Sequence, residues 1–261
     1  TTDSFSDGGR LDFATSLAHA RRMLGDGARI VDIGGESTRP GATPVDETDE
    51  LERVVPLVEA LARDGACVSV DTTKPAVMRA AVDAGASMIN DVRALQAPGA
   101  LDLAATRDVA VCLVHMQGDP GTMQHAPAYA SVVGEIRAFL ARRAAACIDA
   151  GIAASRIVVD PGFGFGKTVA HNLALLRDLG AITTLGYPVL AGLSRKSTLG
   201  TITGRDVGER MAASVAAALA AALRGARILR VHDVRETIDA LAVFHAIEPW
   251  SAARPPSAAE Q

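Results

Sequence analysis

The chain has 261 residues, a formal net charge of −4 and only one Trp, two Tyr and six Phe. A chain of this length buries a sizeable core without disulfides, so we expect Cys67, Cys112 and Cys147, which form no CxxC pair, to be small core residues of a cytoplasmic protein. The mild negative charge argues against nucleic acid, and no apolar run approaches the roughly 20 residues of a membrane span.

The chain opens on a polar, glycine-containing loop that leads into a helical pattern, with no strand before it. Short apolar, β-branched runs then alternate with helical patterns such as 46–65, 74–86 and 209–226. This alternation predicts a parallel sheet with crossover helices. The predicted strands are 28–35, 66–71, 86–91, 109–115, 156–160, 187–193 and 227–233.

Seven strands, each followed by a helix, indicate an α/β fold of the (β/α)8 TIM-barrel type whose first strand is missing ahead of Thr1. A doubly wound sheet is the alternative, because counting elements does not prove closure. We expect one domain over residues 1–249 and a loosely ordered tail over 250–261, where the apolar periodicity stops.

Polar residues end almost every predicted strand, at the face where a barrel carries its active site. A single such residue can instead cap a helix or start a turn, and we prefer that interpretation for Asp91 and Asp233. For Glu36 a role as a base is the alternative to the structural role in its loop that we favour, and for His115 contact with a ligand is the alternative to an at least equally expected hydrogen bond to a loop. The remaining ends offer acceptors at Asp71, Asn90 and Asp160, and positive charge at Arg39, Lys196, Arg230 and His232. Such a set suits a polar heterocycle beside an anionic group.

The segment DPGFGFGKT, residues 160–168, resembles a phosphate-binding loop but fails both patterns by one position. A P-loop needs glycine at position 161, where Pro161 stands, and a dinucleotide fingerprint needs glycine at position 167, where Lys167 stands. We therefore expect a tight turn beneath a flat ligand, with Thr168 as the N-cap of the next helix.

Eight motifs then occur in the order found in bacterial dihydropteroate synthases, which the chain resembles from Thr1 to about residue 247. They are TTDSFSDGG, VDIGGESTRPGA, VSVDTTKPAV, INDV, VHMQGDPGTMQ, DPGFGFGKTVAHNLALL, GLSRKSTLG and RVHDV. The resemblance implies a dimeric barrel that joins 6-hydroxymethyl-7,8-dihydropterin diphosphate to 4-aminobenzoate, releasing pyrophosphate. It also implies assistance by Mg2+ and competition by sulfonamides.

The resemblance also implies roles for single residues. The expected pterin-binding residues are Asp71, Asn90, Asp160 and Lys196, and the expected diphosphate-binding residues are Thr38, Arg230, Val231 and His232. The expected aminobenzoate pocket comprises Phe5, Thr38, Arg39, Pro40, Phe165 and Ser197. Those expected to act in catalysis are Asp71, Lys196, Arg230 and His232. The family's metal-binding asparagine would lie upstream of Thr1, so no metal ligand is named.

Two other functions fit part of this pattern. A pterin-binding methyltransferase of the folate/corrinoid type would share the acidic and amide residues, but not the combination of ESTRPGA, SRKS and RVHD. A catalytically silent paralogue is the second alternative, against which the intact Asp71, Asp160, Lys196, Arg230 and His232 argue.

Overall fold

The computed structural model describes residues 12–38, 42–119 and 121–247. The first half of the chain runs through α1 (Phe13–Gly25), β1 (Ile30–Gly34), α2 (Glu47–Arg63), β2 (Cys67–Asp71), α3 (Pro75–Asp83), β3 (Met88–Asp91), α4 (Ala100–Ala105), β4 (Ala110–Val114) and α5 (Val132–Asp149). The second half runs through β5 (Ile157–Asp160), α6 (Val169–Arg177), α7 (Gly180–Thr183), β6 (Leu190–Ala191), α8 (Ser197–Thr203), α9 (Met211–Leu223), β7 (Ile228–Leu229) and α10 (Val234–Ile247). Two short 3-10 turns, Ala154–Arg156 and Val207–Glu209, complete it.

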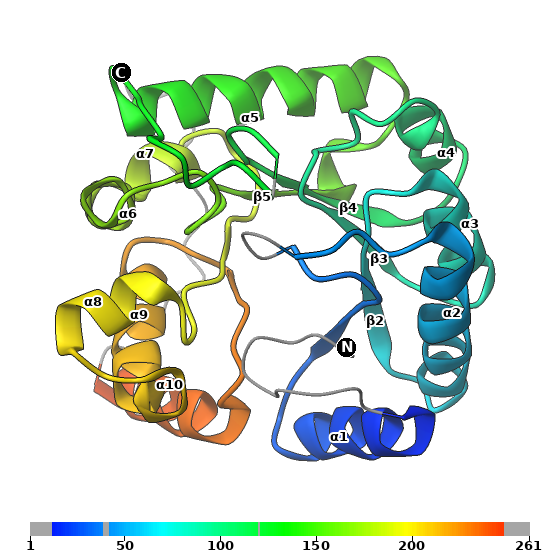
Figure 1. Cartoon of the computed structure of the whole chain (residues 1–261), viewed down its shortest axis with the longest axis horizontal. Coiled ribbons are helices and arrows are strands. Elements are labelled where there is room, and N and C mark those ends of the chain that lie inside the picture. The colour runs from blue at the N-terminus through cyan, green and yellow to red at the C-terminus, as the bar shows by residue number, and fades with distance from the viewer. Residues whose placement is uncertain (1–11, 39–41, 120, 248–261) are drawn as a thin grey trace.

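The strands pair in chain order, and every pairing is parallel. β1 to β5 form one sheet, β6 pairs with β7, and a bridge between Val159 and Val189 joins the two parts. A doubly wound sheet reverses its strand order at a switch point, so the unbroken order excludes that alternative. The helices run once round the outside of the strands in chain order (Figure 1), as in a (β/α)8 barrel.

All seven predicted strands are present, although β6 and β7 are shorter than predicted, with two residues each. In the described residues β1 and β7 each have one paired neighbour, and they are the two edges of the sheet. The strand expected ahead of Thr1, the domain limit at 249 and the tail over 250–261 lie outside the described residues and stay predictions.

The alternation of side chains along the strands divides the buried residues into two layers. Residues such as Val68, Val70 and Leu113 face the helices in the larger core. Met88, Cys112, Val114, Val158 and Leu190 face the barrel interior in a smaller cluster. The expectation that all three cysteines are buried is wrong for Cys67, which is exposed because it is the first residue of β2.

Candidate active site

The interior-facing positions turn polar at the carboxyl ends of the strands. β1 contributes Asp32 and β2 contributes Asp71, while the register pairs Asp71 with Asn90 of β3. Asp160 is the last residue of β5, and Arg230 directly follows β7. The predicted acceptors therefore meet a predicted cation at one mouth of the barrel, as the shared direction of parallel strands requires.

Hydrogen bonds and ion pairs connect Asp32, Asn90, Asp160 and Arg230 into one cluster, and Asp71 lies beside it. Asn90 Nδ2 donates to Asp32 Oδ2 at 3.0 Å, and Arg230 Nη1 lies 3.3 Å from the same oxygen. Arg230 Nη2 donates to Asp160 Oδ2 at 3.1 Å. The other oxygen of Asp160 accepts from Gly162 N at 2.7 Å. Arg230 thus bridges two carboxylates on opposite sides of the mouth.

Two acceptors in this cluster are buried and unpartnered in the described part of the chain. They are Asp71 Oδ1 and Asn90 Oδ1, and Ser69 Oγ, one interior position below Asp71, shares their state. A buried polar atom without a hydrogen bond costs about 1–3 kcal/mol. Two such acceptors lie beside one another here. Their unmet hydrogen bonds indicate a ligand that brings donors into the mouth.

The cluster shifts the proton affinities of its members. Burial raises the pKa of Asp71 to about 8, and the Asp32 carboxylate adds to the rise while Arg230 opposes it. Burial lowers the pKa of Lys196 to about 7, reinforced by Arg230 and opposed by Asp160 and Asp71. The pKa of Arg230 is raised despite its burial, because Asp160, Asp32 and Asp71 surround it. The empty site therefore favours a proton on Asp71 near neutral pH.

Lys196 and Phe165, predicted from motifs about 30 residues apart, lie together. Lys196 Nζ donates to the carbonyl oxygen of Phe163 and lies 4.7 Å from the centroid of the Phe165 ring. Phe165 is 9% exposed, so one ring face is covered by the ammonium, a favourable cation–π arrangement. The pair forms a wall of the mouth between β5 and β6.

The predicted diphosphate segment follows β7. His232 Nδ1 lies 2.9 Å from Ser194 Oγ, which also accepts from His232 N at 3.2 Å. Val231 stands between Arg230 and His232, beyond the end of β7. Arg230, for its part, is engaged by Asp32 and Asp160 in the unliganded structure.

The predicted aminobenzoate residues fall into two groups. Thr38 is half-buried in the loop after β1, and Ser197 is an exposed residue at the start of α8. Phe5, Arg39 and Pro40 lie outside the described residues. Their expected roles stay predictions.

Two members of this region were missed by the sequence reasoning. Asp32 was overlooked because it lies inside the apolar run ARIVDIGG, two residues before the strand ends. A carboxylate at mid-strand was itself a signal, since a strand buried on both faces does not otherwise tolerate one. Lys167 was read only as a mismatch to a P-loop, yet it is 3% exposed.

Four residues expected to be structural are indeed engaged in contacts within the protein. Asp91 accepts from the backbone N–H groups of Arg93 and Leu95, and burial raises its pKa to about 6. Glu36 accepts from Val45 N at 3.1 Å and pairs with Lys74. Thr168 caps α6 in a capping box. The contact of Asp233 is not local, because its carboxylate pairs with the side chain of Arg195, 38 residues away in the sequence.

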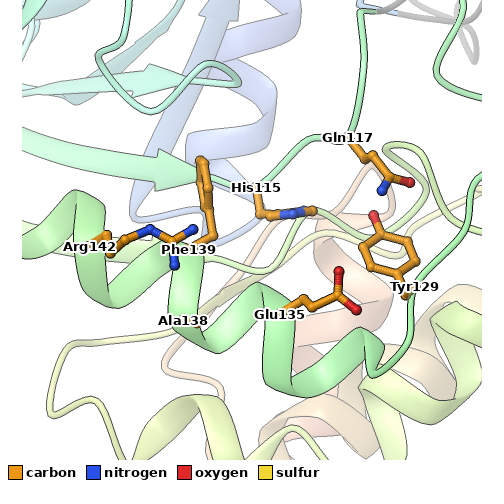
Figure 2. Close-up of a pocket in the computed structure, with 7 residues that line it drawn as sticks. All are labelled: His115, Gln117, Tyr129, Glu135, Ala138, Phe139 and Arg142. Atoms are coloured by element: carbon orange, nitrogen blue, oxygen red, sulfur yellow. The ribbon is translucent and has the colours of Figure 1, made fainter.

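A separate cavity of about 240 Å3 lies beside the end of β4. Figure 2 shows His115 and Gln117 on one side of it, Tyr129 at its edge, and the side chains of α5 along its floor. The α5 residues are Glu135, Ala138, Phe139 and Arg142. His115 is bonded to the loop after β5 through Lys167, at 3.0 Å, as the sequence predicted for this histidine.

In the described residues no three His, Cys, Asp or Glu side chains gather into a metal-binding cluster. Mg2+ commonly binds through one or two carboxylates and substrate phosphates, without a dedicated protein cage. None of the helices described is long and apolar enough to span a membrane.

Comparison with known proteins relates the whole barrel to one group of enzymes. The family model described as pterin binding enzyme matches residues 1–232. The dihydropteroate synthase of Escherichia coli (strain K12) is 48% identical over 248 residues, which cover 94% of this chain and 88% of that protein.

Two solved structures are similar over nearly the same length. Yersinia pestis dihydropteroate synthase, solved with a sulfonamide drug complex, matches with a TM-score of 0.93 and 49% identity, covering 95% of this chain and 91% of that one. Xanthomonas albilineans dihydropteroate synthase, solved with 4-aminobenzoic acid, matches with a TM-score of 0.89 and 53% identity, covering 95% and 90%.

Proposed function

Because the chain belongs to the dihydropteroate synthases, a family of pterin-binding enzymes, we propose that the polar mouth of the barrel is where it carries out the family's reaction. The reaction condenses 6-hydroxymethyl-7,8-dihydropterin diphosphate with 4-aminobenzoate to 7,8-dihydropteroate and pyrophosphate. The observation that carries the placement is the group of unpartnered buried acceptors at Asp71 and Asn90.

The pterin edge supplies the donors that this group lacks. Its amino-pyrimidinone edge presents adjacent N–H groups, which a carboxylate or an amide oxygen accepts with two-point geometry. Asn90 Oδ1 and the Asp160 carboxylate, both buried, are the acceptors that we assign to this edge. Asp71 lies beside the ring, where its ionised form stabilises positive charge as that charge develops, and the developing charge in turn favours this form over the protonated one.

We assign the diphosphate to Arg230 and His232. Breaking the C–O bond to the methylene leaves the electron pair on diphosphate, so fixed positive charge and donors near that oxygen lower the barrier. Arg230 uses two of its five donors on Asp32 and Asp160, which leaves further N–H groups for phosphate oxygens. Thr38 and the Val231 backbone complete this part of the proposal.

We place the aminobenzoate ring against Phe165 and its carboxylate near Ser197, in a pocket that the resemblance extends to Thr38, Phe5, Arg39 and Pro40. The aniline nitrogen attacks the methylene carbon, forms the C–N bond and then loses a proton. Since the pterin cation is a strong electrophile, no protein nucleophile is assigned. Sulfonamides, which resemble aminobenzoate, are proposed to compete for the same pocket.

The order of bond breaking has its own test. If the C–O bond breaks before aminobenzoate attacks, labelled bridging oxygen should scramble within diphosphate in the absence of aminobenzoate. No scrambling, with a diphosphate group free to rotate, would argue for a concerted displacement instead.

We further propose that Mg2+ assists by neutralising the departing diphosphate, as the family resemblance implies. No step above depends on the metal. Loss of turnover on chelation and its return on adding Mg2+ is the expected result.

We propose that the protein is a cytoplasmic homodimer. Apolar side chains remain exposed on adjacent helices, with Leu223 of α9 at 56% and Val243 and Ile247 of α10 at 62% and 73%. An exposed apolar surface of this kind is typical of a protein contact, and a second copy is the occupant that the resemblance implies.

Product analysis separates this function from the two alternatives. The chain, given both substrates, should release pyrophosphate and dihydropteroate in equal amounts. A folate/corrinoid methyltransferase would instead transfer a methyl group and release no pyrophosphate. A silent paralogue would bind the pterin without turnover.

A further inference from the structure

The chain uses lysine at only three positions, against 23 arginines among its 26 basic residues. The three are Lys74, Lys167 and Lys196, and each follows a strand at the same end of the barrel. Lys74 pairs with Glu36 and Glu50, and Lys196 lies in the proposed site. The three lysines therefore stand at positions that suit a compact ammonium better than a planar guanidinium.

Lys167 is the most enclosed of the three, at 3% exposure. Its Nζ donates to Gly162 O at 2.8 Å and to Phe165 O at 2.9 Å, and it lies 3.0 Å from His115 Nδ1. His115 O is a fourth, longer partner at 3.4 Å, so all three donors of an ammonium have acceptors within reach. An arginine side chain does not fit this tight group of converging carbonyl oxygens.

The turn that Lys167 holds carries several groups of the proposed site. Asp160 Oδ1 accepts from Gly162 N, Phe163 O accepts from Lys196, and the Phe165 ring lies under the same ammonium. Lys167 binds the two ends of this turn, at Gly162 O and Phe165 O. Its charge also interacts with Asp160 and Lys196 of the proposed site.

The turn is also pressed against the end of β4. Gly162 and Gly166 have φ of +68° and +60°, and a Cβ at Gly162 would come within 1.9 Å of His115 O. At Gly166 a Cβ would come within 2.5 Å of Gln117 O. Tyr129 adds a hydrogen bond from its hydroxyl to Gly166 O at 2.9 Å. The backbone of this turn and the backbone at the end of β4 thus lie very close together, and Lys167 is hydrogen-bonded to both.

His115 is the partner of Lys167 at the end of β4, and this contact determines which nitrogen of its ring carries the proton. Burial lowers the pKa of Lys167 to about 7, so below that pH its amine is an ammonium, which only donates. Nδ1 of His115 then accepts, and the ring proton lies on Nε2. Burial lowers the pKa of His115 to about 3, and Lys167 contributes to the fall. Phe139 packs edge-on at 4.9 Å between ring centroids, but the cavity of Figure 2 borders the ring as well. Packing alone therefore does not fix the orientation of the His115 ring, and the hydrogen bond to Lys167 does.

We propose that Lys167 is a positioning residue for pterin binding: it locks the turn 160–165 onto the end of β4 through His115 and so fixes Asp160 and Phe165 in the mouth. The identity of the ligand in this statement rests on the function proposed above, whereas the contact between Lys167 and His115 is independent of that function.

The test compares Lys167→Met with the wild-type full-length chain below pH 7. Methionine has a similar length without donors, so the turn loses its partner while the space stays filled. The dissociation constant of dihydropterin diphosphate should rise about tenfold or more, as expected when charged hydrogen bonds are lost, with kcat reduced much less because Lys167 touches no reacting atom. Val58→Ala, in the core on α2, should lower the melting temperature and leave that dissociation constant unchanged.

Nitrogen-15 NMR of the histidines gives a readout that a general loss of stability does not move. In the wild type His115 should carry its proton on Nε2, and in Lys167→Met this preference should be lost. Assignment uses His115→Gln. A wild-type His115 protonated on Nδ1 would overturn the proposal even if the variant fails to fold.

A variant that binds dihydropterin diphosphate within twofold of the wild type would also overturn it. A wild-type chain that fails to bind the pterin diphosphate would instead contradict the proposed function, and the NMR result would still report on the contact between Lys167 and His115.

Discussion

At the residue scale, the buried carboxyl of Asp71 carries a cost that depends on pH. Its pKa rises from an ordinary value of 3.8 to about 8 on folding, so the folded chain binds more protons than the unfolded chain between these values. Stability from this group is full below about pH 4 and is lost as the pH rises to about 8. Proton loss from Asp71 therefore lowers the stability of the folded chain.

Asp71→Asn should therefore melt at a higher temperature than the wild type at pH 8, with the difference shrinking toward pH 4. The amide keeps the shape and carries no charge beside Asp32. Asp12→Asn is the control, because hydrogen bonds from Thr15 lower the pKa of that exposed N-cap. It should show no such gain at pH 8. Equal melting of wild type and Asp71→Asn at pH 8 would show that Asp71 is not destabilised by burial.

Lys196→Ala should weaken binding of pterin diphosphate, or turnover with it, on the order of tenfold or more, because a charge-assisted contact is lost. The ammonium lies on the Phe165 ring and beside the carbonyl of Phe163, at the edge of the mouth. Steady-state kinetics with each substrate varied measures the effect. Unchanged kinetics would remove Lys196 from the site.

The placement of single residues could be predicted where a polar residue ends a strand, but not where it depends on partners far away in the sequence. Asp71, Asn90 and Asp160 were found because a polar residue ends an apolar run. Asp32 was missed inside such a run, although Asn90 and Arg230 both contact it. The pairing of Arg230 with two carboxylates was also invisible, since Asp32 lies 198 residues away in sequence.

At the scale of elements, the loop after β5 is the one whose backbone most constrains its sequence. Gly162, Gly164 and Gly166 all have positive φ. The sequence predicted a tight turn here. Its cause was not predictable, because the carbonyls that exclude a Cβ belong to His115 and Gln117 of another strand end.

Gly162→Ala should destabilise the fold and weaken pterin binding, because the new Cβ meets both a backbone oxygen and a strained φ. Gly151→Ala is the matched control: its φ is +96° and nothing lies within 4 Å of its Cβ position. That control should cost about 1–2 kcal/mol from the left-handed backbone alone. Chemical denaturation and pterin titration of both variants separate the two effects. Equal losses in both would show that contact with His115 is unimportant.

At the scale of the whole molecule, the repeated order of strand and helix predicted parallel strands with crossover helices and favoured a barrel by the number of strands. Buried parallel strands give continuous apolar runs, and the seven runs correspond to the seven strands of the described chain. The doubly wound alternative was resolved only by the strand order, which sequence periodicity does not contain. That β6 and β7 are only two residues long was not predicted, because apolar residues continue beyond the paired positions 190–191 and 228–229.

The proposed dimer predicts a change in mass. Leu223→Glu together with Val243→Glu should convert a dimer to a monomer, since charges buried without partners oppose association. Ile148→Glu on α5, at 41% exposure, is the control on another helix and should leave the mass unchanged. Sedimentation equilibrium measures both. A wild-type monomer would contradict the proposal directly.

The most direct test of the central claim is pyrophosphate release by the wild-type chain and by Asp160→Ala, with Mg2+ and both substrates present. The account predicts steady release in the wild type that requires 4-aminobenzoate as well as dihydropterin diphosphate. Asp160→Ala, which removes a buried acceptor of the proposed pterin edge, should lower kcat/KM for the pterin by about tenfold or more. Release at the wild-type rate by Asp160→Ala would contradict the site. No release by the wild type would contradict the function.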